Sequence, residues 1–245
     1  MKKQFFAAAF MMNAALYAQA GTVVYSSNGT TVTSTGNSIV VVNGQVISGN
    51  GKAVMSEGPV QTEQRNTDSY TGVILDAPVN FTYTVATAAS MKITAPENIL
   101  PLVTTKVVDR HLVIGIKEPT ILTTPIEIVA TGPNLASFWI AGSGNVQASG
   151  LSGTLLRLKI SGSGSISAAG QVDAIVAEIS GSGGIDASRI QAADVTANVS
   201  GSGSIQAYAS RSIKADASGS GGITITGSPP QRSVNRSGSG QVTFK

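Results

Sequence analysis

Serine hydroxyls repeated at a regular interval are the first candidates for chemistry in this chain. They stand at the centres of Gly-Ser-Gly triplets, which are separated by 20, 19, 20, 18 and 19 residues. Stacked hydroxyls could hydrogen-bond a glycan along the repeats, or they could satisfy backbone groups in tight turns. On the first interpretation the candidate contacts are Ser163, Ser182 and Ser202. The triplets begin at Gly142, Gly162, Gly181, Gly201, Gly219 and Gly238.

Two aromatic residues are further candidates for sugar contact. Trp139, the only tryptophan, precedes the first triplet at an outward-facing parity. An indole there could stack on a sugar ring, or the preceding β segment could cover it. Tyr208 is a second aromatic residue of the same kind, in a later repeat.

Charged residues form one predicted outward column when the repeats are aligned, and this column raises the question of catalysis. Its carboxylates would lie two coils apart, about 9–10 Å at the spacing of β-strands. That separation is at or beyond the edge of what an inverting glycosidase uses. The alternative is an exposed polar face with one Lys-Glu cross-strand pair, which we favour, so we assign no catalytic residue and expect no enzyme. The column contains Lys159, Glu178, Asn198 and Asp216.

Metal ligands are scarce in the sequence. The chain has one histidine, His111, and no cysteine. Zinc sites draw most of their ligands from these two residue types. Calcium-binding nonapeptide repeats would need an aspartate next to glycine in every turn, whereas the corners here carry serine. We therefore expect neither a metal site nor a cofactor.

Alternating apolar residues around each triplet indicate the elements that must position these side chains. A period of two predicts strands with one buried face. Each repeat supplies two short strands and two turns, and stacking the repeats pairs equivalent strands in parallel. The sequence therefore predicts an all-β parallel β-helix with about 19–20 residues per coil, regular over residues 141–245. Arg232 and Arg236 replace apolar residues in the last repeat, as a solenoid cap would require.

The segment before the regular coils is predicted to be irregular β structure. Strand patterns occur at 73–75, 79–85, 91–94, 105–108 and 112–116. Residues 57–68 have the composition of a polar linker. Residues 21–61 form either a β-hairpin appendage or a flexible arm, because Asn43-Gly44 lies between two apolar runs at 39–47 and Asn28-Gly29 is a second turn candidate.

The first twenty residues have the pattern of a signal peptide. Lys2 and Lys3 precede an apolar stretch at 5–16, and Ala18-Gln19-Ala20 suits cleavage. The apolar stretch is too short for a membrane span, so export to the periplasm, or secretion to the cell surface, is expected. Removing Lys2 and Lys3 from the 16 basic residues leaves 14 against 13 acidic ones. This balance and the scattered basic residues exclude nucleic acid as a partner.

Residues 62–245 resemble the "putative auto-transporter adhesin, head GIN domain" family. The resemblance rests on a strand-turn-strand at 70–85, on MKITAPENIL at 91–100 followed by DRHLVI at 109–114, and on PNLAS at 133–137 leading into the Ser-Gly series. It implies a right-handed parallel β-helix and brings no catalytic residues. The family's name favours a binding role at a surface.

These observations together predict an exported, non-enzymatic β-solenoid with a binding, adhesion or structural role at the bacterial envelope or surface. Its expected partner is a glycan or an envelope or surface protein, and no stable membrane span is expected. Two alternatives remain at this point. One is a polysaccharide-degrading β-helix enzyme using Glu178 or Asp216. The other is a self-assembling structural protein.

Overall fold

The computed structural model describes residues 40–42, 45–48 and 53–245. The expected signal peptide at 1–20 and the Asn28-Gly29 turn lie outside the described residues. Strands dominate the described part of the chain, whose one helical element is the short 3-10 helix η1 (Leu100–Leu102). The fold is a β-solenoid of about 5 turns preceded by irregular strands, which confirms the predicted fold class.

Contacts within the chain divide it into two compact units, a small one at Met1–Met55 with Glu118–Thr123 and a large one at Ser56–Lys117 with Thr124–Lys245. In the small unit, β1 (Val40–Val42) pairs antiparallel with β2 (Gln45–Ser48), on either side of Asn43-Gly44. The turn residues themselves lie outside the described residues. β3 (Val54–Met55) pairs in parallel with β10 (Thr120–Ile121).

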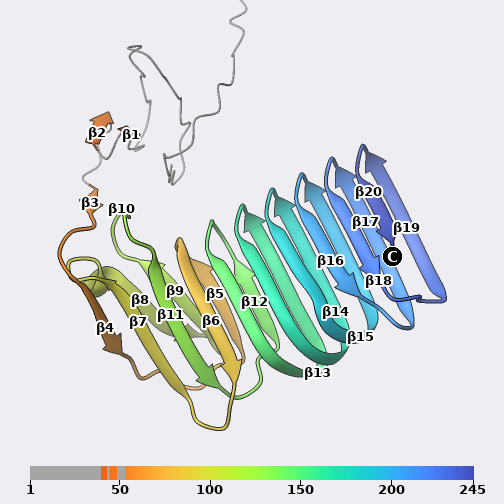
Figure 1. The fold of residues 1–245 in the computed structure, drawn as a ribbon, viewed down its shortest axis with the longest axis horizontal. Helices are drawn as coiled ribbons and strands as arrows, with labels where there is room; N and C mark the ends of the chain where they lie inside the picture. The colour runs from red at the N-terminus through yellow and green to blue at the C-terminus, as the bar shows by residue number, and fades with distance from the viewer. Residues whose placement is uncertain (1–39, 43–44, 49–52) are drawn as a thin grey trace, which may run out of the picture. The chain divides into compact units, whose positions relative to one another are not determined.

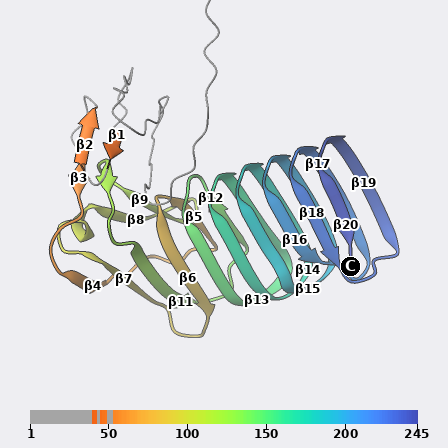
Figure 2. The same ribbon diagram turned by 45° about the horizontal axis from the view of Figure 1, so that its top comes forward.

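The regular coils of the large unit are stacked strands that run through two faces (Figures 1 and 2). We call the strand segments that follow each triplet the first face, and those that precede it the second face. Equivalent segments pair in parallel from coil to coil. The strands are β13 (Asn145–Gly162), β14 (Ser165–Gly181), β15 (Gly184–Gly201), β16 (Ser204–Tyr208), β17 (Ser212–Gly219), β18 (Gly222–Thr226), β19 (Gln231–Gly238) and β20 (Gln241–Phe244).

Strands from the irregular segment continue both faces toward the N-terminal end of the large unit. The second face continues through β12 (Ser137–Ile140), β5 (Gly72–Asp76), β9 (His111–Ile116) and β8 (Val103–Val108). The first face continues through β6 (Val79–Val85), β11 (Ile126–Gly132), β7 (Ser90–Pro96) and β4 (Val60–Gln64). Here the pairing is mixed, with antiparallel pairs at β7 and β8.

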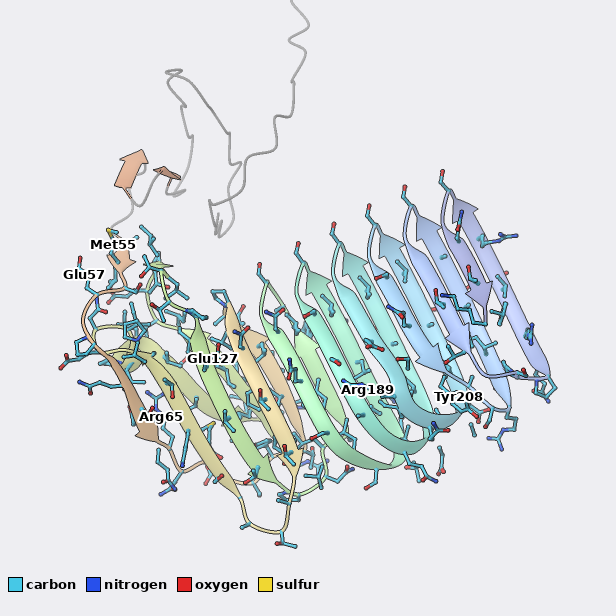
Figure 3. All side chains as sticks on the ribbon, in the orientation of Figure 1. Met55, Glu57, Arg65, Glu127, Arg189 and Tyr208 are labelled. Atoms are coloured by element: carbon cyan, nitrogen blue, oxygen red, sulfur yellow. The ribbon has the colours of Figure 1, made fainter. Side chains whose placement is uncertain are left out.

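The prediction of a polar linker at 57–68 is wrong for residues 60–64. Val60–Gln64 is strand β4, which pairs antiparallel with β7. An edge strand needs only backbone hydrogen bonds on one side, so its polar composition is no obstacle. Arg65, labelled in Figure 3, connects the end of β4 to the opposite face. Its guanidinium donates to the carbonyl oxygens of Val103 at 2.5 Å and Leu100 at 2.9 Å. Its guanidinium also bonds Glu63 at 3.0 Å and lowers the pKa of that carboxyl.

The core lies between the two faces and is filled by alternating inward side chains. Isoleucines and alanines fill the narrow regular coils, where Ile166, Ile205 and Ala197 are at most 1% exposed. Larger rings fill the wider N-terminal part, where Tyr83 stacks with Phe81 and meets Phe138 edge-on. Tyr83 donates to the carbonyl oxygen of Pro133 at 2.6 Å, and burial raises the pKa of its phenol.

The triplet corners are closed by backbone groups of neighbouring coils. At the fourth corner, the backbone N–H groups of Ser202 and Gly203 both donate to the carbonyl oxygen of Gly181 at 3.0 Å. Gly201 has a φ of +119°, and a Cβ added there would lie 2.5 Å from that same oxygen. Glycine is required at this position because any side chain would separate the two coils.

The last coil differs from the others, as expected for a terminal repeat. β19 is exposed along its whole length and β20 is only half-buried. The guanidinium carbon of Arg232 lies 4.3 Å from the centre of the Phe244 ring, and Arg232 Nε donates to the carbonyl oxygen of Pro229 at 2.9 Å. Arginine therefore covers an apolar ring that no further coil buries.

The corner geometry predicts unequal effects of the same substitution at two triplets. Gly201→Ala should lower the free energy of unfolding by about 2–4 kcal/mol, because it combines a left-handed φ with a backbone clash. Gly142→Ala is the matched control, since a Cβ on Gly142 meets nothing within 4 Å. Chemical denaturation followed by circular dichroism measures both. Equal midpoints for the two variants would contradict this account of the corners.

Candidate functional site

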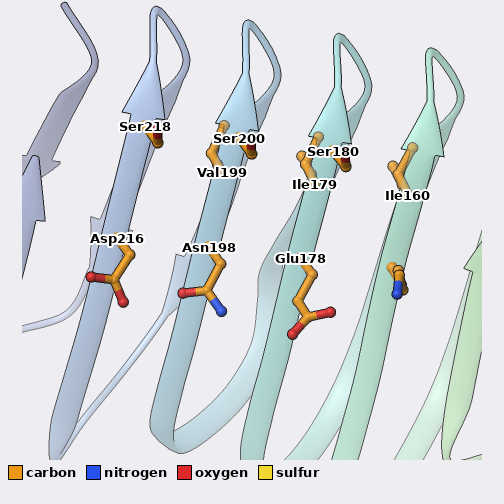
Figure 4. Close-up of a pocket in the computed structure, with 10 residues that line it drawn as sticks. Ile160, Glu178, Ile179, Ser180, Asn198, Val199, Ser200, Asp216 and Ser218 are labelled. Atoms are coloured by element: carbon orange, nitrogen blue, oxygen red, sulfur yellow. The ribbon is translucent and has the colours of Figure 1, made fainter. Parts of the chain in front are cut away.

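One row of side chains on the outer surface of the second face gathers most of the candidate residues. Successive strands β12, β13, β14, β15, β17 and β19 each place one member at the same register. We call this set the polar row. Three of its members, Glu178, Asn198 and Asp216, are labelled in Figure 4. The row consists of Trp139, Lys159, Glu178, Asn198, Asp216 and Asn235.

A column of serines runs beside the polar row, two residues further along each strand (Figure 4). It contains Ser161, Ser180, Ser200, Ser218 and Ser237. A shallow groove lies over the row and the column, from Lys159 to Asp216. Sequence reasoning found the row but missed these serines. Their period was present in the sequence, because one of them immediately precedes each triplet after the first.

Trp139 lies at the N-terminal end of the polar row with its indole exposed, at 38% of its maximum. The second interpretation, in which the preceding β segment covers the indole, is wrong, because β5 lies beside β12 in the same sheet and places Ile74 next to Trp139 in the register. Val113 follows in β9, so three apolar side chains face outward on adjacent strands. On the other side the Nζ of Lys159 lies 5.1 Å from the centre of the ring.

The carboxylates of the polar row are held apart. Asn198 stands between Glu178 and Asp216 in the register. Asp216 Oδ1 accepts from Asn235 Nδ2 at 2.7 Å, and Lys214 Nζ lies 4.0 Å from Oδ2. Lys159 and Glu178 face each other in the register as predicted, yet they form no ion pair in the described structure, because the ammonium lies over Trp139.

The triplet serines Ser163, Ser182 and Ser202 are exposed at the corner that follows the serine column. Their backbone N–H groups, not their hydroxyls, bond the preceding coil, with the carbonyl oxygens of Gly142, Gly162 and Gly181 as acceptors. Among the described residues, none bonds these hydroxyls. The serine side chains therefore do not stabilise the turns, which was one of the two interpretations of the sequence.

Tyr208 lies on the first face and is half-buried, next to Thr226 in the register (Figure 3). Trp139 lies on the second face. The structure therefore does not bring the two aromatic candidates into one site.

His111 begins β9, directly after a two-residue turn in which Asp109 and Arg110 both have positive φ. Its Nδ1 donates to the carbonyl oxygen of Asp109 at 2.9 Å, which leaves Nε2 to accept from the hydroxyl of Ser137 at 3.2 Å. The imidazole thus joins the turn to β12. Within the described residues there is no group of three or more His, Cys, Asp or Glu side chains that could hold a metal ion.

An ion pair outside the polar row stabilises the turns before the second-face strands. Arg211 donates to both carboxylate oxygens of Asp194, with Nε at 2.9 Å from Oδ1, and Ser212 Oγ donates to Oδ1 at 2.6 Å. The hydrogen bond from Arg211 and, to a smaller extent, that from Ser212 lower the pKa of Asp194 to about 2.

Of the helices in the described part of the chain, none is long and apolar enough to cross a membrane.

Comparison with known proteins relates this chain to one family. The family model described as "putative auto-transporter adhesin, head GIN domain" matches residues 69–229. A putative adhesin of known structure from Bacteroides fragilis NCTC 9343 is 22% identical, with a TM-score of 0.64. A second, from Parabacteroides distasonis ATCC 8503, is 20% identical, with a TM-score of 0.52. Each match covers 79% of this chain and 100% of the other, and shows the fold alone. No curated protein matches the chain.

The position of Lys159 predicts how Trp139 fluorescence responds to charged quenchers. Trp139 is the only tryptophan, so the emission reports this end of the polar row. Relative to a free indole, iodide quenching should be favoured over caesium quenching by about twofold to threefold at low salt, because the ammonium 5.1 Å from the ring centre attracts the anion. Lys159→Gln should narrow the difference, whereas Lys92→Gln on the first face should not. Equal narrowing by both variants would show that only the overall charge matters.

The Asp194–Arg211 pair predicts a pH-dependent contribution to stability. A lowered pKa means that folding favours the ionised carboxylate, so the contribution is complete above about pH 4 and is lost as the pH falls toward 2. Asp194→Asn should therefore lower the thermal midpoint at pH 7 and converge with the wild type near pH 2. Asp68→Asn, at an exposed position that takes part in no ion pair of the described structure, is the control. A difference between wild type and Asp194→Asn that persists at pH 2 would contradict the assignment.

Proposed function

This chain belongs to the family described as "putative auto-transporter adhesin, head GIN domain", and we propose that it is an exported, non-enzymatic binding protein that holds a glycan on its second face. The family name and the solenoid fold support a binding role. The site that we assign to that role is the polar row with the serine column beside it.

The observation that carries the proposal is the exposed indole of Trp139 in line with hydrogen-bonding side chains. A sugar ring presents both an apolar C–H surface and hydroxyl groups. Trp139, with Ile74 and Val113 beside it, offers an apolar surface for the first. Amide, carboxylate and hydroxyl groups on the following strands offer donors and acceptors for the second.

The stacked backbone fixes these groups before any ligand arrives. Parallel strands hold equivalent residues about 4.8 Å apart, so the row repeats its hydrogen-bonding groups at a constant interval along the solenoid. A site on rigid strands loses little conformational entropy on binding. This regularity suits a polymer that repeats along the same direction.

The same geometry supports a role without catalysis. A glycosidase needs two carboxyl groups on either side of one bond, one to donate a proton and one to activate water or attack. Glu178 and Asp216 lie two coils apart, and an amide side chain stands between them. The Asp216 carboxylate is also engaged by Asn235 and Lys214.

A glycan array with residues 21–245 of the wild type and of two aromatic variants tests the proposal. Trp139→Ala should weaken binding to any recognised glycan by at least about tenfold, because exposed aromatic residues dominate such contacts. Tyr208→Ala is the matched control on the other face and should bind like the wild type. Equal loss in both variants, or binding that survives Trp139→Ala, would reject the second face as the site. A blank array for the wild type would reject the glycan.

A further inference from the structure

We propose that the sugar recognised at Trp139 is acidic, with its ring against the indole and its carboxylate on Arg157 and Lys159. This inference rests on the proposed function and names the chemical class of its ligand. Both basic residues belong to β13, the strand next to β12, and both point outward. In the register Arg157 lies beside Ser137, and Lys159 lies beside Trp139.

These two cations lack acidic partners within the described structure. The described ion pairs on the regular coils are Arg211 with Asp194 and Lys214 with Asp216. Arg157 is in neither, and the Nζ of Lys159 is directed to an aromatic ring rather than a carboxylate. The Arg157 guanidinium and the Lys159 ammonium are two residues apart on one strand. Both present N–H donors from which a carboxylate can accept hydrogen bonds.

The acidic residues nearby lie further from the indole in the register than Lys159 does. Glu178 follows Lys159 in the register but is half-buried, whereas Lys159 and Arg157 are exposed. Asp76 lies at the end of β5, beyond the residue that pairs with Ile140. On the far side of the apolar strip, exposed Lys106 is paired with Val113 in the register. A ligand that covers the strip from Trp139 to Val113 therefore meets a cation at each end, Lys159 at one and Lys106 at the other.

Lys159 is placed so that a ligand can contact it with a carboxylate while its sugar ring contacts Trp139. Its ammonium lies 5.1 Å from the ring centre, so a carboxylate bound to it stands next to the indole. A sugar whose ring contacts Trp139 can place a carboxylate on this ammonium without crossing another strand. Glu178 and Asn198 then face the next sugar along the row.

Matched polymers test the charge directly. Polygalacturonate, alginate and hyaluronan are each titrated against the protein beside their methyl esters, which keep the backbone and remove the charge. Trp139 fluorescence and biolayer interferometry follow binding. We expect at least one acidic polymer to bind and its ester to bind about tenfold or more weakly, with an affinity that falls as salt rises.

Variants assign the charge effect to these residues. Lys159→Gln and Arg157→Gln should each weaken binding of the acid several-fold more than binding of the ester. Lys92→Gln removes one charge from the first face and should change neither. All are exposed positions, and an unchanged thermal midpoint confirms the fold of each variant.

The outcomes separate this inference from the proposed function. If acid and ester bind equally and Trp139→Ala abolishes both, the ligand is a glycan and the charge assignment is wrong. If neutral glycans bind on the array and none of the acidic polymers does, the inference is also overturned. If no saccharide binds in either experiment, both proposals fail. Loss of acid binding in Lys92→Gln as large as in Lys159→Gln would reduce the effect to overall charge.

Discussion

The close approach of backbones at the triplet corners is the constraint on which the regular coils depend. A carbonyl oxygen of one coil accepts two N–H groups of the next, and there is no room between them for a Cβ. Every coil that stacks on a preceding corner must therefore bring glycine to the same place, and the chain between corners can vary by only a residue or two. This spacing holds equivalent strand residues opposite each other through β13, β14 and β15.

Fixed register has consequences on both sides of the sheet. Inward, it stacks apolar side chains, mostly isoleucine and alanine, on one another and so builds a narrow core. Outward, it turns a sequence period into rows of side chains, of which the polar row is one. The side chains of the row stabilise the fold less than the corner glycines do, because most of the stability comes from the core and from backbone hydrogen bonds. Under the proposed function these side chains contact the ligand.

In the N-terminal part of the large unit, the strand register is set in a different way. It has no glycine corners to set the register, and its strands pair in both directions. Specific contacts replace the repeat, such as Arg65 on two carbonyl oxygens and His111 on Ser137. This part places β5 beside β12 and so provides the apolar neighbours of Trp139. The candidate site thus lies where the irregular strands join the regular coils.

The sequence by itself determined the all-β solenoid, its period, its inward residues and the column from Lys159 to Asp216. These follow from short-range patterns, since a period of two sets the faces and the triplets set the coils. Only the tertiary structure decided which strand lies beside Trp139, that Lys159 turns to the indole and away from Glu178, that Tyr208 is on the other face, and that β4 joins an edge. Those outcomes depend on pairings between strands distant in the sequence and on the choice of one side-chain conformation among several, and no local pattern encodes either.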